Sequence, residues 1–208
     1  MRLFLCGQKS FGAAVLKRLL SDGHEVVGIA APPKEQYFDK TKIAAIKAGI
    51  QLIIDNDKLR SADIPAGTDL IVAAHSHQFI SEKVLARTRL GGIGFHPSAL
   101  PRHRGRDAVR WAVAMGDHIT GGSVYWLSDV VDGGDLQAQK FVFIERSWDY
   151  HRLWRELFPL GVTMLSDAIK DIAEGNINRI PQSVKNATWE PAYDEHKRIF
   201  RPELLQIG

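Results

Sequence analysis

His96 and Asp132 lie far apart in the sequence, but their types and settings suit acid–base chemistry. His96 directly follows an apolar run at residues 92–95, and Asp132 begins the turn-like sequence Asp-Gly-Gly at 132–134. An imidazole that meets a carboxylate can hold a proton and exchange it with a reacting group. Each residue also has a structural interpretation: a hydrogen-bonded histidine at a strand end, and an aspartate that shapes a turn. Whether the two residues are catalytic or structural therefore depends on whether the fold brings them together.

The first half of the chain alternates apolar runs with amphipathic segments. Between the first two runs the pattern predicts a helix with Val15, Leu16, Leu19 and Leu20 on its apolar face and Ser10 as its cap. Further helices are predicted at 40–48 and 81–87. Strands are predicted at 2–6, 25–30, 51–54, 70–74 and 92–95. This order predicts an α/β fold with a Rossmann-like, mostly parallel sheet and helices on both faces.

The second half of the chain has longer elements. A helix is predicted at 108–115, strands at 121–127 and 136–144, and a long helix at 147–174 with a kink at Pro159. Gly175 is expected to end that helix. We expect one domain over residues 1–180 and a short carboxy-terminal tail over 181–208 that packs on it as extended segments.

Polar residues follow several of the predicted parallel strands. They are Gln8, the segment 75–79, and His96 with Ser98. Ligands of open parallel sheets bind at the carboxyl ends of the strands, so these groups are expected to converge on one crevice.

Composition excludes several classes of protein. The 208 residues carry a formal charge of +3, too small an excess to argue for nucleic acid. Cys6 is the only cysteine and lies in an apolar run, so it cannot form an internal disulfide and is expected to be buried. No apolar stretch is long enough to span a bilayer, and the start has no cleavage region, so a cytoplasmic protein is expected. His75 and His77 without further ligands are too weak a pattern for a metal, and none is predicted.

The segment 95–105, Phe-His-Pro-Ser-Ala-Leu-Pro-Arg-His-Arg-Gly, resembles the signature of folate-dependent formyltransferases. The second half of the signature follows at a fitting distance. It runs from Thr-Gly-Gly-Ser-Val at 120–124 to Asp132, which stands before a glycine. Over almost the whole chain the sequence is most similar to the amino-terminal hydrolase domain of 10-formyltetrahydrofolate dehydrogenase. Segments at 7–12, 23–28, 76–80, 157–175, 181–182 and 187–190 carry that likeness.

The resemblance implies a formyltransferase fold, 10-formyltetrahydrofolate as co-substrate, and His96 and Asp132 as catalytic residues. Formyl transfer passes through a tetrahedral intermediate, to whose oxyanion a protonated histidine can donate while a carboxylate supports the imidazolium or shuttles a proton. Folate recognition would fall on loop backbone at Gln78, Phe79, Ile80, Val130, Val131 and Gly133. Phe79 has an equal claim to a core role. Ser98, Arg102, Arg104 and Arg106 are candidates for the acceptor or the folate glutamate tail, although Arg104 has a structural alternative in binding loop carbonyls.

One position departs from the family pattern. The transferases carry an asparagine two residues before the histidine, where this chain has Gly94, and the hydrolase domain also lacks it. Losing an oxyanion donor can cost about 3–4 kcal/mol. Three functions therefore stay open: transfer to an amine, hydrolysis to formate and tetrahydrofolate, and a catalytically weak folate-binding domain with a regulatory role.

The identity of the formyl acceptor is narrowed only by excluding known classes. The segment 7–12 lacks the glycine-rich phosphate loop of glycinamide ribonucleotide transformylases. Transfer to initiator tRNA normally involves a further carboxy-terminal domain, and none is expected here. A small amine, or water, is the expected partner of folate. The oligomeric state is left open, a homo-oligomer included.

Overall fold

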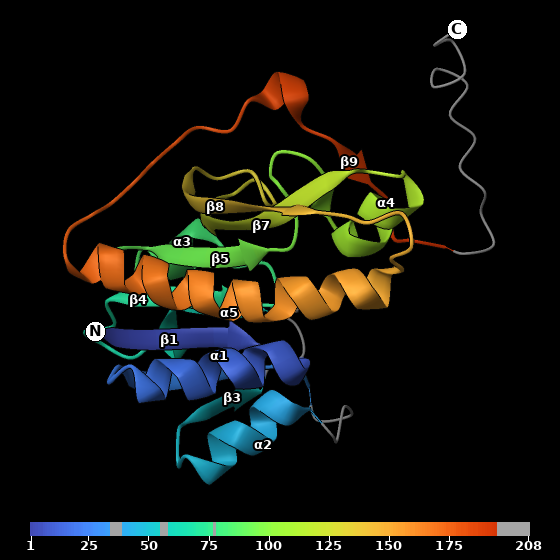
Figure 1. Cartoon of the computed structure of the whole chain (residues 1–208). Coiled ribbons are helices and arrows are strands. Elements are labelled where there is room, and N and C mark those ends of the chain that lie inside the picture. Colours follow the sequence, from blue (N-terminus) through green and yellow to red (C-terminus); the bar gives the residue numbers. More distant parts are fainter. Residues whose placement is uncertain (34–38, 55–57, 77, 195–208) are drawn as a thin grey trace, which may run out of the picture.

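A computed structural model describes residues 1–33, 39–54, 58–76 and 78–194, and shows one seven-stranded sheet between two layers of helices (Figure 1). The strand order is β3-β2-β1-β4-β5-β7-β8. The first five strands in this order pair in parallel, and β7 and β8 join as antiparallel neighbours. The predicted α/β class and the mostly parallel sheet are confirmed. His77 and the tail beyond residue 194 lie outside the described residues.

The strands match the apolar runs of the sequence to within two residues. Their bounds are β1 Arg2–Gly7, β2 Glu25–Ala31, β3 Leu52–Ile54, β4 Leu70–Ala74, β5 Gly92–His96, β7 Ile119–Trp126 and β8 Leu136–Phe143. A separate two-stranded parallel pair joins β6 (Arg104–Gly105) to β9 (Trp189–Glu190). This pair ties the tail to the loop that follows His96.

The helices differ from the expectations in their ends. They are α1 Lys9–Ser21, α2 Lys40–Lys47, α3 Glu82–Leu85, α4 Ala108–Ala114 and α5 Tyr150–Ala173, with 3-10 turns η1 Ser61–Asp63 and η2 Val184–Asn186. Ser10 lies inside α1, whose N-cap is Gln8, so the predicted cap was wrong. Helix α5 begins at Tyr150 because the Asp149 carboxylate accepts the amide N–H of Arg152. Pro159 lies inside the helix and does not end it.

Side chains alternate between the two faces of the sheet, as the period of a strand requires. Leu3 and Leu5 of β1 join the larger apolar cluster, which α1 and α5 cover. Phe4 and Cys6 join the second cluster, together with Leu59 and Ile64, which flank η1, and with residues of α3. Burial raises the pKa of the Cys6 thiol to about 12, so this cysteine is a core residue, as expected. Leu20, predicted on the apolar face of α1, is instead exposed.

The same alternation fixes the orientation of β5. Phe95 points into the cluster beneath α5, between Gly122 and Gly161. His96 and Gly94 therefore face the opposite side of the sheet, together with Tyr125 of the neighbouring strand β7. Packing of Phe95 thus decides where the imidazole of His96 points.

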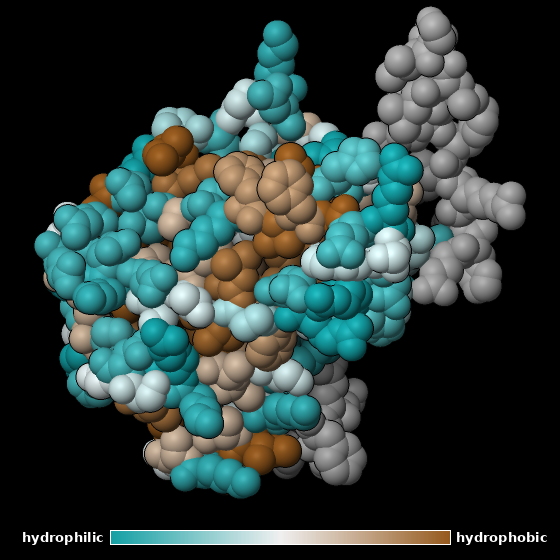
Figure 2. All heavy atoms as spheres, in the orientation of Figure 1, coloured by the Kyte–Doolittle hydropathy of each residue, from teal (hydrophilic) through white to brown (hydrophobic). Residues whose placement is uncertain are grey.

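The outer surface is mixed. Figure 2 shows apolar side chains gathered at the level of α5 and β8, within a hydrophilic rim. Phe141 and Phe143 of the edge strand β8 contribute exposed rings. Within the ranges the structure describes, no helix combines the length and the apolar character needed to cross a membrane.

Candidate active site

A cavity of about 840 Å³ opens at the carboxyl ends of β1, β4 and β5. The chain runs from β1 outward to β2 and β3 and returns to β4 on the other side of β1, so the cavity lies at the switch point of the sheet. Gln8, His75 and His96, from the ends of those three strands, all line it. The convergence of strand ends predicted from sequence is therefore observed.

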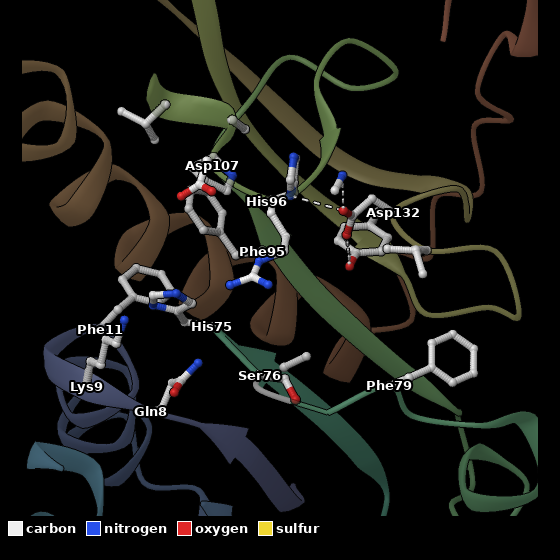
Figure 3. A pocket seen from close by; sticks show the side chains of 18 of the residues that line it. Gln8, Lys9, Phe11, His75, Ser76, Phe79, Phe95, His96, Asp107 and Asp132 are labelled. Carbon is white, nitrogen blue, oxygen red and sulfur yellow. Dashed lines mark hydrogen bonds and ion pairs between the residues drawn. The ribbon is translucent and has the colours of Figure 1, made fainter. Parts of the chain in front are cut away.

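The cavity has two ends with His96 between them (Figure 3). Phe79 and Asp132 lie on one side of the imidazole, whereas Lys9, Phe11 and His75 lie on the other. Reactants that approach from opposite ends would thus meet at His96.

His96 and Asp132 face each other, with the imidazole Nδ1 3.4 Å from carboxylate Oδ2. Both side chains are largely buried, at 7% and 11% exposure. The Nε2 atom of His96 lies 2.6 Å from the backbone carbonyl oxygen of His103. A carbonyl can only accept, so Nε2 carries the hydrogen and Nδ1 is the nitrogen left for chemistry. The structure thus brings the two predicted catalytic residues together and gives the histidine a fixed orientation.

Three further contacts hold Asp132 in its place, where the backbone has a positive φ of 51°. The Tyr125 hydroxyl donates to Oδ1 at 2.6 Å, and the Gly105 backbone N–H donates to Oδ2 at 2.8 Å. The Gln182 side-chain amide donates to the Asp132 backbone carbonyl at 2.9 Å. The carboxylate oxygens are thereby distinguished: Oδ2 faces His96 and Oδ1 faces the tyrosine.

Burial, and then the charge and the hydrogen bond of Asp132, raise the pKa of Tyr125 well above its usual value. The phenol therefore keeps its proton at every physiological pH and remains a donor. Its ring also lies against Gly94: a Cβ at that glycine would be 3.2 Å from two ring carbons. A side chain at position 94 would therefore lie in tight contact with the ring of Tyr125.

Near His96 and Asp132, the ring of His103 lies between two carboxylates. Its Nε2 lies 2.8 Å from Asp117 Oδ2, and its Nδ1 lies 3.1 Å from Glu190 Oε2. The Arg102 guanidinium closes on Asp117 at 2.6 Å. Burial alone would raise the pKa of Asp117, but hydrogen bonds from His103 and Arg102 outweigh it and lower that pKa to about 2. This network fixes the loop whose carbonyl orients His96.

The predicted folate-binding residues lie on one end of the cavity. Gln78, Phe79, Ile80, Val130 and Val131 line it, and Phe79, Val130 and Val131 expose about half of their side chains. Gly133 does not line the cavity; its N–H donates to the Val130 carbonyl and closes the turn that presents Asp132. The two segments expected to recognise folate are thus side by side in space.

Of the predicted acceptor contacts, only Arg106 lines the cavity. The Ser98 hydroxyl donates to the Arg102 carbonyl, and the Arg102 guanidinium pairs with Asp117. Arg104 donates twice to the Gln182 side-chain oxygen. The expectation for Ser98, Arg102 and Arg104 is therefore corrected: they hold the loop and the tail together.

Sequence reasoning missed several residues of the site. Tyr125 and Gln182 carry no motif, and only the pairing of β5 with β7 and the return of the tail reveal their roles. His75 was expected to reach the crevice as part of the segment 75–79, but no role was predicted for it; it lines the end of the cavity opposite Phe79. Desolvation, and then the charge of Lys9, lower the pKa of His75, so its imidazole is neutral at pH 7.

Among the described residues no group of three or more His, Cys, Asp or Glu side chains is arranged to hold a metal.

The doubly wound sheet, with a histidine–carboxylate pair at its switch point, defines the class of protein. A family model described as formyl transferase matches residues 1–169, and the chain belongs to this family. Two relatives are cytosolic 10-formyltetrahydrofolate dehydrogenase of Xenopus tropicalis and the mitochondrial enzyme of Homo sapiens, each 34% identical. The matches cover 92% and 91% of this chain, which spans only 22% of the length of each relative.

Solved structures share the fold. An N-formyltransferase from Helicobacter canadensis, in complex with folinic acid and dTDP-3-aminofucose, gives a TM-score of 0.75 at 13% identity over 91% of this chain and 70% of that one. Glycinamide ribonucleotide transformylase 1 from Symbiobacterium toebii gives 0.73 at 19% identity over 88% of this chain and 93% of that one. At these identities the likeness establishes the fold. Both solved proteins are named as enzymes that transfer formyl groups.

Proposed function

We propose that this chain uses 10-formyltetrahydrofolate and moves its formyl group to an amine of a small acceptor. One observation carries the proposal: the imidazole of His96 faces the carboxylate of Asp132 on the wall of a cavity with two distinct ends. A transfer between two reactants needs such an arrangement, because both must reach the same catalytic group.

The end that holds Phe79 suits the folate. A pterin is flat and needs an apolar slot with backbone hydrogen-bonding groups along its edge. Phe79, Val130 and Val131 supply apolar surface, and the loops at 78–80 and 130–132 supply the backbone. In this placement the formyl group lies beside His96 and Asp132.

The acceptor amine then attacks the formyl carbon, and the carbonyl π electrons move to the oxygen. The protonated Nδ1 of His96 donates to this oxyanion, while the charge of Asp132 stabilises the imidazolium. The attacking nitrogen loses a proton, the folate N10 gains one, and the bond from carbon to N10 breaks. The products are the formylated amine and tetrahydrofolate. Asp132, whose carboxylate faces His96 at 3.4 Å, is the proposed base through which that proton passes.

Lys9, His75, Arg106 and Asp107 line the remainder of the cavity and form the proposed acceptor end. A neutral His75 can accept a hydrogen bond from an amine. Lys9 and Arg106 suit an anionic group on the acceptor or on the folate tail. The acceptor is therefore proposed to be a small polar amine.

Hydrolysis is the second candidate, because the dehydrogenase relatives share about a third of the residues and Gly94 offers no side-chain donor to the formyl oxygen. In this version water attacks the same carbon and formate leaves with tetrahydrofolate. The residues and their roles are otherwise the same.

We also propose the extent and the compartment of the catalytic unit. Residues 1–180 form the catalytic domain and residues 181–208 its tail; tail hydrogen bonds to residues 103, 104 and 132 support this division. The proposed compartment is the cytoplasm, which is supported by cytosolic proteins among the relatives. Nucleic acid and metal are not part of the proposed reaction.

Release of tetrahydrofolate from 10-formyltetrahydrofolate by the purified protein, with and without a panel of small amines, tests the proposal. Release that depends on an amine is expected for the transferase, and equal release without amine identifies the hydrolase. Tight folate binding without release under either condition would contradict both enzymatic functions and leave a binding protein.

A further inference from the structure

Gly94 lies directly opposite Tyr125 on the antiparallel strands β5 and β7. Side chains at opposed positions normally share the space between the strands. Here a Cβ at position 94 would lie 3.2 Å from the tyrosine ring and 3.1 Å from a methyl carbon of Leu127. The glycine therefore makes room for the ring to lie across the neighbouring strand.

The hydroxyl at the end of this ring has a specific partner. It donates to Oδ1 of Asp132 at 2.6 Å, while Oδ2 receives the Gly105 N–H and faces His96 Nδ1. A short hydrogen bond from a neutral donor to a carboxylate is stronger than a bond between neutral groups. Without it, the side-chain oxygens of Asp132 would keep one directed partner besides His96 among the described residues.

A simple packing role does not account for this geometry. A buried tyrosine needs a partner for its hydroxyl, but a backbone carbonyl would serve equally well for packing. Tyr125 instead binds the carboxylate that faces His96, and its own ring lines the cavity.

We infer that Tyr125 is a positioning residue of the active centre, which fixes Asp132 Oδ1 so that Oδ2 stays turned to His96, and that Gly94 is the residue that permits this. The inference rests on the proposed function, since it assigns a role in the same reaction. It also gives a physical reason for the glycine: the Cβ of an asparagine at position 94 would lie only 3.2 Å from the tyrosine ring, so the ring would have to shift.

Tyr125→Phe tests the inference, because the variant keeps the ring and removes only the hydroxyl. We expect kcat for tetrahydrofolate release to fall about 10- to 100-fold, as for loss of a residue that orients a group in the active centre. KM for 10-formyltetrahydrofolate should stay within about twofold, since the hydroxyl acts on Asp132.

Gly94→Ala provides an independent route to the same loss. Its Cβ would lie 3.2 Å from the ring of Tyr125, so the ring has to shift by a few tenths of an ångström and this variant should also lower kcat. In the Tyr125→Phe background Gly94→Ala should add little, because both changes remove one interaction. Tyr193→Phe is the control, since its ring packs on Trp111 and does not line the cavity; its kcat should stay within about twofold of wild type.

The outcomes separate the inference from the proposed function. If the wild-type protein releases tetrahydrofolate and Tyr125→Phe keeps its kcat within twofold, the inference is overturned and the proposed function stands. A rise in KM alone, or additive effects of the two substitutions, would also overturn it, since the hydroxyl would then act on the ligand or not through Asp132. Should the wild-type protein release nothing, the proposed function fails first. Urea unfolding and folate binding of each variant show whether the fold is retained.

Discussion

Asp132 and His96 owe their geometry to backbone groups of the loop after His96 and to two side chains outside the signature segments. The imidazole is oriented by a backbone carbonyl, and the carboxylate by a backbone N–H, a tyrosine hydroxyl and a side-chain amide on its own carbonyl. Such preorganisation removes the need to reorient these groups when charge develops on the substrate. For the proposed reaction, residues 103, 105, 125 and 182 are therefore expected to matter as much as the pair itself.

Asp117→Asn should weaken the protein at the residue scale. The Asp117 carboxylate pairs with both Arg102 and His103, and its side chain is only 12% exposed. Removing one member of a buried charge network leaves its partners uncompensated, so we expect the free energy of unfolding to fall by about 3 kcal/mol. Urea unfolding at pH 7 measures this difference.

Asp167→Asn is the matched control for this prediction. Asp167 pairs with Lys140 at 3.7 Å, and both side chains are about half exposed. Exposed pairs contribute at most about 1 kcal/mol. A similar loss for both variants would contradict the claim that the buried network stabilises the loop.

The sequence predicted the central residues but not their supports. His96 and Asp132 could be predicted because each lies in a motif with distinctive neighbours. The directions of Arg102 and Arg104 could not, since the partners that hold them, Asp117 and Gln182, lie 15 and 78 positions further along the chain. A loop arginine beside a site can point toward the ligand or toward the protein, and only tertiary contacts decide which.

At the scale of elements, the tail completes the wall behind the active pair. Strand β9 pairs with β6, and Thr188 accepts the N–H of His103. Gln182 joins the tail to two segments at once: its amide donates to the carbonyls of Asp132 and Gly134, and its oxygen accepts from Arg104. The turn that presents Asp132 is thus fastened to the strand whose N–H binds its carboxylate.

Gln182→Ala should therefore reduce both stability and catalysis. Loss of these hydrogen bonds is expected to lower the free energy of unfolding by about 1–3 kcal/mol. A small displacement of Asp132 should lower kcat by about tenfold or more. Ser183→Ala is the control, because Ser183 is exposed and its side chain makes no capping bond. Wild-type kcat in Gln182→Ala would show that the tail does not position the turn.

Helix α5 supports the strand that carries His96. A Cβ at Gly161 would lie 2.5 Å from the ring of Phe95, so the helix can approach β5 only with glycine at this position. Gly161→Ala gains about 1 kcal/mol in helix propensity, but overpacking costs about 1–3 kcal/mol. We expect net destabilisation in thermal unfolding, whereas Lys170→Ala on the exposed face of α5 should change little. Stabilisation by Gly161→Ala would contradict the tight contact.

Most elements could be predicted because their signals are local. Buried parallel strands such as β1 and β4 are continuous apolar runs, and the long helix α5 has a clear apolar face. Strands β6 and β9 contain two residues each, too few for any periodicity, and they form only because the tail returns to the catalytic loop. The sequence predicted that the tail packs on the domain but not which residues pair, because the tail has no clear periodic pattern of apolar residues.

For the whole molecule, the pKa values predict a loss of stability in acid. The Arg2 backbone N–H and then Arg89 lower the pKa of Asp69, and the Asp117 pKa is about 2. Carboxyls with lowered pKa values stabilise the fold above their unfolded values of about 4 and lose this contribution as pH falls toward 2. Burial lowers the pKa values of His24 and His75, so the unfolded chain binds more protons below about pH 6.5.

Urea unfolding between pH 8 and pH 3 should therefore show two declines. The first is expected as pH falls through about 6.5, from the two histidines, and the second below about 4, from the carboxylates. Asp117→Asn should reduce the second decline. Stability that stays constant or rises from pH 7 to pH 3 would contradict this assignment of charges.

The central claim is that the His96–Asp132 pair performs the chemistry on a folate bound nearby. The most direct test is Asp132→Asn, measured for both 10-formyltetrahydrofolate binding and tetrahydrofolate release. We predict that release falls by about 10²- to 10⁴-fold while the dissociation constant for the folate changes by less than about tenfold. Release within a few-fold of the wild-type rate, in a variant that folds and binds folate, would contradict the claim.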